Sequence, residues 1–250
     1  MTPSVDNSSS VVASKRRRDL LALLYTLVYP TLLTWGYFVL GKGLDPSTSR
    51  LCYTVGKTLQ FAFPALYVAF ALKERWFIRR FNTRGLLVGG LFGVAVGLVI
   101  FLGGRHFMTS PGVFTDLVER TGVEFQERLT SFGLESKALF TVVFLFYSFC
   151  HSGLEEYYWR WFAFRSLEKR FNWLTSALTA NIAFVFHHVV ILGVYFGYDS
   201  FVTWLFSLSI GVGGFVWQLI YKKTDSIYGA WLSHALIDAG IFGLGFYMLP

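Results

Sequence analysis

Charged residues are scarce in this sequence. Asp, Glu, Lys and Arg together make up 15% of its 250 residues, while 54% are hydrophobic and 19% are aromatic. A typical soluble domain carries about 25% charged residues, so this composition excludes an ordinary soluble globular protein. The chain is therefore predicted to be an integral membrane protein.

Cysteine is also rare. The two cysteines, Cys52 and Cys150, form no CxxC motif and lie far apart in the sequence, which argues against a thiolate metal site and against a disulfide framework. The HExxH motif of many zinc metalloproteases is absent as well. Cys150 lies close to polar residues, and we expect it to be a small buried residue rather than a nucleophile.

Long apolar runs dominate what is present. About 20 mostly apolar residues are needed to cross ~30 Å of hydrocarbon, and lipid offers the backbone no hydrogen-bond partner, so each run is expected to be a helix. The chain is thus predicted to be an all-α, polytopic membrane protein with about seven transmembrane helices. The predicted spans cover residues 20–41, 53–72, 85–104, 138–163, 173–197, 201–221 and 226–249.

The basic residues between these spans predict the orientation. The net charge is +7, and 14 basic residues lie on one side of the predicted membrane against 6 on the other. By the positive-inside rule the richer side, which includes the N-terminus, is cytoplasmic. Topology explains the excess charge, so no nucleic-acid partner is expected. The 14 are Lys15, Arg16, Arg17, Arg18, Lys73, Arg75, Arg79, Arg80, Arg84, Arg165, Lys169, Arg170, Lys222 and Lys223.

The remaining segments divide the chain into a tail and one membrane domain. Residues 1–19 begin with small, polar residues and are predicted to form a disordered cytoplasmic tail, while residues 20–250 form a single membrane domain. Between residues 105 and 137, apolar residues recur at near-helical spacing. This pattern predicts an amphipathic helix lying on the outer surface.

Glycine recurs at every fourth residue of the third predicted span. Gly85, Gly89, Gly93 and Gly97 lie on one face of that helix. Small residues in this arrangement let two membrane helices approach closely. The sequence therefore predicts a tight helix contact along this face.

Ionisable residues lie inside three of the spans. Such a residue at the bilayer centre costs about 2.5–3.5 kcal/mol, so it indicates function. The helical rise of ~1.5 Å per residue puts these side chains at similar depths, and one shared interior cluster is the least costly arrangement. Lys57, in the second span, is instead expected to reach the outer surface. The cluster residues are His151, Glu155, Glu156, Arg160, His187, His188, His234 and Asp238.

Spacing within the fourth span separates the two glutamates. Glu156 and Arg160 are four residues apart, which predicts an ion pair on one helix face. Glu155 is rotated by about 100° from Glu156 and shares its own face with His151. Glu156 is therefore expected to stay paired, leaving Glu155 free to exchange a proton with water.

Two mechanisms fit glutamate and histidine residues without cysteine ligands. In one, Glu155 acts as general base on a water molecule while histidines position the water and stabilise the oxyanion. In the other, His188, His234 and a carboxylate hold zinc, which activates the water. His234 and Asp238 are four residues apart, and an aspartate can hold an imidazole in one tautomer.

Three short motifs occur in order on the polar spans. They are EEYYWR at residues 155–160, FVFHH at 184–188 and HALID at 234–238. They resemble the EExxxR, FxxxH and HxxxN/D motifs of the CAAX protease and bacteriocin-processing family, also called the Abi or type II CAAX endopeptidase family. The resemblance covers the C-terminal half, so the catalytic core motifs are expected within residues 138–250.

The resemblance implies a glutamic intramembrane endopeptidase that cleaves near the C-terminus of a lipidated or membrane-associated peptide. It implies no cofactor and no essential metal. It also implies roles for six residues: Glu155 as the catalytic glutamate, Glu156 and Arg160 as its supporting pair, His188 as a partner in water activation, and His234 with Asp238 facing the oxyanion.

Two details of the motifs affect these roles. Phe184 places the second motif on His188 rather than on His187. Asp238 stands where CAAX-processing members carry asparagine, and an ionised aspartate would repel an oxyanion. Asp238 is therefore expected to orient His234, to be protonated, or to mark the bacterial-type branch of the family.

Two other functions fit the same polar clusters. A proton-coupled transporter uses intramembrane Glu, His and Arg, although the spans show no clear inverted repeat and no matched broken helices. A non-catalytic membrane scaffold is the other alternative. For a protease, the expected partners are a peptide or protein substrate in the membrane and the lipid bilayer. The expected location is the plasma (inner) membrane, as a multi-pass protein.

Overall fold

The computed structural model describes residues 6–110, 112 and 115–249, and these residues form helices and no strand. The all-α prediction is confirmed. The α-helices are α1 (Asp6–Phe38), α2 (Pro46–Leu66), α3 (Thr83–Thr109), α4 (Thr115–Phe132), α5 (Lys137–Leu145), α6 (Ser152–Glu156), α7 (Arg165–Glu168), α8 (Trp173–Phe196), α9 (Phe201–Thr224) and α10 (Tyr228–Tyr247). A 3-10 turn, η1 (Leu40–Gly43), and three π-helical segments, η2 (Tyr67–Leu72), η4 (Phe146–His151) and η5 (Tyr157–Phe164), complete them.

Six helical stretches in the described part of the chain are long and apolar enough to cross a membrane. They coincide with the first six predicted spans, and the chain is a multi-pass integral membrane protein. The seventh predicted span is also a helix, α10, but it is not among the six, since its 20 residues include His234 and Asp238. That α10 crosses the membrane stays a prediction.

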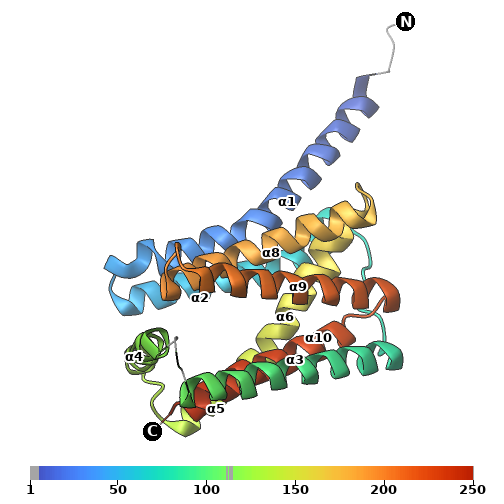
Figure 1. Cartoon of the computed structure of the whole chain (residues 1–250). Coiled ribbons are helices and arrows are strands. Elements are labelled where there is room, and N and C mark those ends of the chain that lie inside the picture. Colours follow the sequence, from blue (N-terminus) through green and yellow to red (C-terminus); the bar gives the residue numbers. More distant parts are fainter. Residues whose placement is uncertain (1–5, 111, 113–114, 250) are drawn as a thin grey trace, which may run out of the picture.

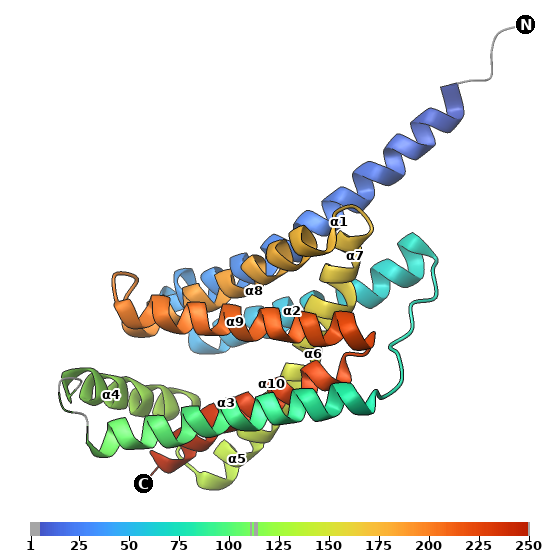
Figure 2. The same ribbon diagram turned by 45° about the vertical axis from the view of Figure 1, so that its right-hand side comes forward.

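The helices form two groups (Figures 1 and 2). One group contains α1, α2, α8 and α9, and the other contains α3, α4, α5 and α10. Helix α6 and its flanking segments pass from the second group to the first. Helix α8 packs on α1 and α9, while α10 contacts α3, α6 and α9. The residues of α6 are therefore surrounded by helices of both groups.

Helices α3 and α10 lie side by side and run in the same direction (Figure 1). A Cβ atom on Gly89 would lie 2.0 Å from the carbonyl oxygen of Gly229, and one on Gly97 would lie 2.6 Å from that of Leu236. Both distances are too short for any side chain. The predicted close contact along the glycine face is confirmed, and its partner is α10, the helix that carries His234.

Several helices begin at a side chain that accepts hydrogen bonds from free backbone amides. Asp45 accepts from two amides at the start of α2, Asn82 from Gly85 at the start of α3, and Asn172 from Thr175 at the start of α8. Such caps satisfy amide groups that have no partner within the helix. They fix where the helix starts, and hence the depth of the residues further along.

The N-terminal segment differs from its prediction. Helix α1 begins at Asp6, so residues 6–19 are helical where a disordered tail was predicted, and residues 1–5 lie outside the described residues. Residues 13–18 read ASKRRR and include good helix formers. Extending an existing helix also costs less than starting one, so the apolar span that follows can continue backwards through this segment.

The helix predicted between residues 105 and 137 is present as α4. Leu129 on its apolar side is buried against Phe140 and Leu249, with Phe125 partly buried beside them. This contact joins α4 to α5 and to the C-terminal end of the chain. Its position on the outer surface of the membrane stays a prediction.

Candidate active site

Both glutamates lie on one helical stretch between two π-helical segments. Segment η4 precedes α6 and η5 follows it, and the five residues of α6 end in Glu155 and Glu156. π-Helical turns are rare and occur often at functional sites. The sequence predicts one regular helix here, because neither apolar content nor spacing reveals a π turn. The two glutamates are 3% and 0% exposed.

Glu156 and Arg160 form the predicted ion pair. Arg160 Nη1 donates to Glu156 Oε1 at 2.9 Å, and its Nη2 donates to the carbonyl oxygen of Gly214 at 3.0 Å. The guanidinium lies 4.8 Å from the ring centroid of Phe184 and 5.1 Å from that of Trp217. Arg160 has no exposed surface. Its charge is thus matched by one carboxylate and two aromatic faces.

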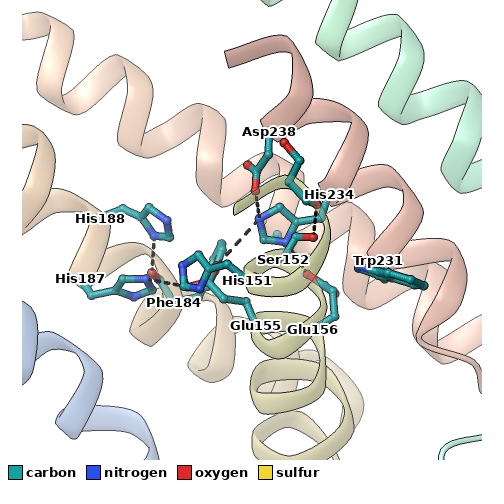
Figure 3. A network of polar contacts seen from close by, with 12 residues as sticks. His151, Ser152, Glu155, Glu156, Phe184, His187, His188, Trp231, His234 and Asp238 are labelled. Atoms are coloured by element: carbon teal, nitrogen blue, oxygen red, sulfur yellow. Dashed lines mark hydrogen bonds and ion pairs between the residues drawn. The ribbon is translucent and has the colours of Figure 1, made fainter. Parts of the chain in front are cut away.

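Glu156 also holds His234. The Nδ1 atom of His234 lies 2.9 Å from the Oε1 atom that Arg160 contacts. The ring of Trp217 stacks on His234 at 4.1 Å between centroids, and its indole N–H donates to Ser233 Oγ at 2.9 Å. A carboxylate facing Nδ1 keeps a proton on that nitrogen. The Nε2 atom of His234 is therefore directed toward Glu155 and Asp238 (Figure 3).

Glu155 is surrounded by imidazole rings from three helices (Figure 3). Its Oε1 lies 3.5 Å from His187 Nε2 and 3.6 Å from His151 Nε2, and its Oε2 lies 3.8 Å from His234 Nε2. The polar residues of the three spans thus meet in one cluster. No Lys or Arg among the described residues forms an ion pair with Glu155, so the two adjacent glutamates have different surroundings.

Two adjacent histidines of α8 contact this cluster. His188, which carries the second motif, has its Nδ1 3.0 Å from the carbonyl oxygen of Phe184. His187 is 2% exposed and stacks parallel to Trp159 at 5.8 Å between ring centroids. The motif assigned a catalytic role to His188 and none to His187. The position of His187 inside a predicted span was the sequence signal that could have included it. In the structure, His187 contacts Glu155 directly.

Asp238 lies at the edge of the cluster. Its Oδ2 is 3.7 Å from His234 Nε2, and its side chain is 18% exposed. The contact expected from their spacing is therefore present. The closer bond to His234 comes from Glu156, at 2.9 Å. Glu156, rather than Asp238, is thus the residue that orients this imidazole.

One group of side chains in the described residues could hold a metal ion. Glu155, His187 and His188 offer ligand atoms that all lie within 4.8 Å of one another. Two histidines and a glutamate are a ligand set that zinc accepts. This set replaces the one considered from the sequence, which contained His188 and His234. The absence of an essential metal or cofactor stays a prediction.

Two residues near the cluster differ from their expected positions. Cys150 is exposed on η4, so the expectation of a buried residue was wrong. Lys57 is partly buried, with its ammonium 5.7 Å from the ring centroid of Tyr53 and 5.5 Å from that of Phe61. It packs against the rings of its own helix instead of lying fully exposed.

The comparison with known families agrees with the motifs. Residues 137–240 match the family model described as type II CAAX prenyl endopeptidase Rce1-like. Neither the curated proteins nor the solved structures give a significant match. The matched segment contains both glutamates, Arg160, all four histidines around them and Asp238. Over residues 137–240, the family model thus supports the resemblance to type II CAAX endopeptidases that the three motifs indicate.

Proposed function

We propose that this protein is an intramembrane endopeptidase that hydrolyses a peptide bond near the C-terminus of a lipidated or membrane-associated peptide. The observation that supports this most strongly is the environment of Glu155. Its buried carboxylate lies 3.5–3.8 Å from the imidazole nitrogens of His151, His187 and His234. A carboxylate without a cationic Arg or Lys partner can accept a proton, and the imidazoles around it can orient water.

In the first step, Glu155 is the general base. It accepts one proton from a water molecule while the water oxygen attacks the carbonyl carbon of the scissile peptide bond. The Nδ1 atom of His188 faces the Phe184 carbonyl, which leaves its Nε2 to accept a hydrogen bond from the same water. His187 packs beside Glu155 and restricts the carboxylate to one orientation.

In the second step, His234 stabilises the oxyanion. Three carboxylates lie within 4 Å of its ring, from Glu155, Glu156 and Asp238, and they favour the doubly protonated imidazolium. Its Nδ1–H then donates to Glu156, and its Nε2–H donates to the oxyanion. Asp238 balances the charge of the imidazolium from the more exposed side.

The last step returns the proton held by Glu155. It passes to the amide nitrogen of the leaving peptide as the C–N bond breaks, and the products are a new C-terminal carboxylate and a free amine. Glu156 and Arg160 take no part in proton transfer. They keep His234 and the helix in position, because the buried pair satisfies both charges.

The membrane fold and the family match support a substrate that lies in the bilayer. A substrate in the bilayer, carrying a lipid or an apolar segment, has direct access to helices that span it. We expect the N-terminus to be cytoplasmic and the protein to reside in the plasma (inner) membrane.

The test uses the purified full-length chain in lipid vesicles with a peptide that carries a prenylated cysteine followed by three residues. Glu155→Gln is expected to lower kcat/KM by at least about 10²-fold, the usual contribution of a general base. Glu168→Gln is the matched control. Glu168 is the last residue of the same helical stretch and pairs with Lys222 of α9. It is not part of the glutamate and histidine cluster, so this variant is expected to cleave at the wild-type rate.

Two outcomes would contradict the proposal. Cleavage by Glu155→Gln at the wild-type rate would remove Glu155 from the reaction. A chelator is expected to leave cleavage unchanged; loss of activity that zinc restores would instead assign water activation to a metal held by Glu155, His187 and His188.

A further inference from the structure

Lys57 of α2 is a basic residue inside a predicted span. No carboxylate among the described residues lies within ion-pair distance of its ammonium group. Its contacts are the faces of Tyr53 and Phe61, at 5.7 and 5.5 Å. A charged side chain at such a place is costly and is usually functional. The mechanism proposed above gives Lys57 no role.

One ring that the ammonium group contacts also contacts the catalytic cluster. The Phe61 ring that it contacts also packs edge-on against His151 at 5.9 Å between centroids. His151 in turn lies 3.6 Å from Glu155. Lys57 is thus separated from the general base by two rings, a gap that a few residues of extended chain, at about 3.3–3.6 Å each, can bridge.

Aromatic rings from neighbouring helices pack near the two rings that this lysine contacts. Tyr53 stacks on Tyr37 of α1 at 4.2 Å between centroids, and Tyr147 of η4 packs edge-on against His151 at 5.0 Å. Lys57 is itself partly buried. A carboxylate that reaches its ammonium group is therefore attracted more strongly than it would be in bulk water.

We infer that Lys57 binds the C-terminal carboxylate of the peptide substrate. This inference rests on the proposed function, since a substrate cut near its C-terminus brings a terminal carboxylate to within a few residues of Glu155. A lysine ammonium and a carboxylate carry opposite charges, and their attraction is stronger where bulk water is partly excluded. The contact would set how many residues lie beyond the scissile bond, so Lys57 determines specificity and does not act in the chemical step.

The test compares three peptides, identical up to the last residue, as substrates of the full-length protein in vesicles. The first ends in a free carboxylate, the second in a carboxamide, and the third is the carboxamide with glutamate as its last residue. Wild-type protein is expected to cleave the free acid at least tenfold better than the amide in kcat/KM, mainly through KM. The third peptide is expected to behave like the amide.

Three variants locate the effect. Lys57→Met is expected to cleave the acid and the amide equally well. Both rates should equal the rate at which wild-type protein cleaves the amide. A wild-type rate on the amide shows that the catalytic cluster is intact. Lys57→Arg is expected to keep the preference for the acid. The matched control Lys137→Met changes an exposed lysine at the start of α5 and should keep it as well.

The outcomes separate this inference from the proposed function. Cleavage of none of the peptides by wild-type protein would overturn both. Equal cleavage of acid and amide by wild-type protein, whatever the variants do, would overturn the role of Lys57 alone, as would a preference that persists in Lys57→Met. Full cleavage of the amide with a terminal glutamate would show that the ligand is a side-chain carboxylate, and would overturn the terminal assignment.

Discussion

Glu155 and Glu156 are adjacent in the sequence but have different partners. Glu156 Oε1 accepts from both Arg160 and His234 at 2.9 Å, whereas Glu155 has only imidazoles beside it. Successive residues of a helix point about 100° apart. Two adjacent glutamates can therefore have different partners and different roles. Glu156 stabilises the fold around the site, and in the proposed mechanism Glu155 activates water.

This difference predicts that the same substitution at the two glutamates has different effects on stability. Glu156→Gln leaves the buried Arg160 without its counter-ion and is expected to lower the free energy of unfolding by about 3–5 kcal/mol, with loss of cleavage. Glu155→Gln is expected to abolish cleavage while leaving the thermal unfolding temperature within a few degrees of the wild-type value. Thermal unfolding in detergent and peptide cleavage measure the two effects.

Either of two results would refute this division of roles. One is a Glu156→Gln variant that unfolds at the wild-type temperature, since the ion pair would then contribute little. The other is a Glu155→Gln variant that unfolds well below wild type, since Glu155 would then be a structural residue.

Contacts between single residues could be predicted where both residues lie on one helix. The pairs Glu156 with Arg160 and His234 with Asp238 follow from a spacing of four residues, and both contacts are present. The link between Glu156 and His234 joins two helices, and no spacing reveals it. His187 was passed over for the same reason, because only the rotation of α8 decides whether it or His188 lies nearer Glu155.

At the scale of elements, the contact between α3 and α10 positions His234, which the proposed mechanism uses to stabilise the oxyanion. The glycines of α3 let the α10 backbone approach so closely that a Cβ on Gly93 would lie 2.8 Å from the Cα of Ser233. Ser233 precedes His234 and accepts from Trp217. A change in this contact therefore moves the imidazole relative to Glu155.

Two neighbouring glycines of α3 test this contact. A Cβ on Gly89 would lie 2.0 Å from the carbonyl oxygen of Gly229, while one on Gly90 would meet only Leu232 Cδ2 at 3.5 Å. Gly89→Ala is expected to lower stability by about 1–3 kcal/mol, the usual cost of overpacking, and to reduce cleavage. Gly90→Ala is the control.

Measuring the thermal unfolding and the peptide cleavage of both variants tests whether the glycine face positions α10. We expect Gly90→Ala to match wild type in both measurements, since its added methyl group makes an ordinary contact. Equal behaviour of the two variants would show that the glycine face does not position α10.

At the scale of the whole molecule, ion pairs connect the segments predicted to be cytoplasmic. Arg79 pairs with Asp225 at 3.0 Å, and Lys169 pairs with Glu74 at 2.9 Å. Hydrogen bonds from Trp76 and Lys169 hold the pKa of Glu74 below its usual range, so this carboxylate stays charged at neutral pH. Basic segments far apart in the sequence thus meet at one end of the molecule.

The predicted orientation can be tested by labelling single cysteines. With Cys52 and Cys150 replaced by alanine, a cysteine at Ser8 or Asp225 is expected to react with a membrane-impermeant maleimide from the cytoplasmic face. One at Asp199, between α8 and α9, is expected to react from the opposite face. Labelling of Asp225→Cys and Asp199→Cys from the same face would contradict the predicted topology.

Sequence alone determined the features that depend on short stretches of chain. Apolar runs specified the helices, the four-residue glycine repeat specified a close contact, and three motifs specified the chemical residue types of the site. Each follows from local helical geometry, which repeats along any helix.

Tertiary structure alone decided which of these features meet. It placed α10 against the glycines of α3, set His234 against Glu156 and His187 against Glu155, and packed Phe61, which Lys57 contacts, against His151. The physical reason is that contacts between helices depend on the rotation and depth of each helix. Side-chain packing across the whole bundle sets both, and no single stretch of sequence contains that information.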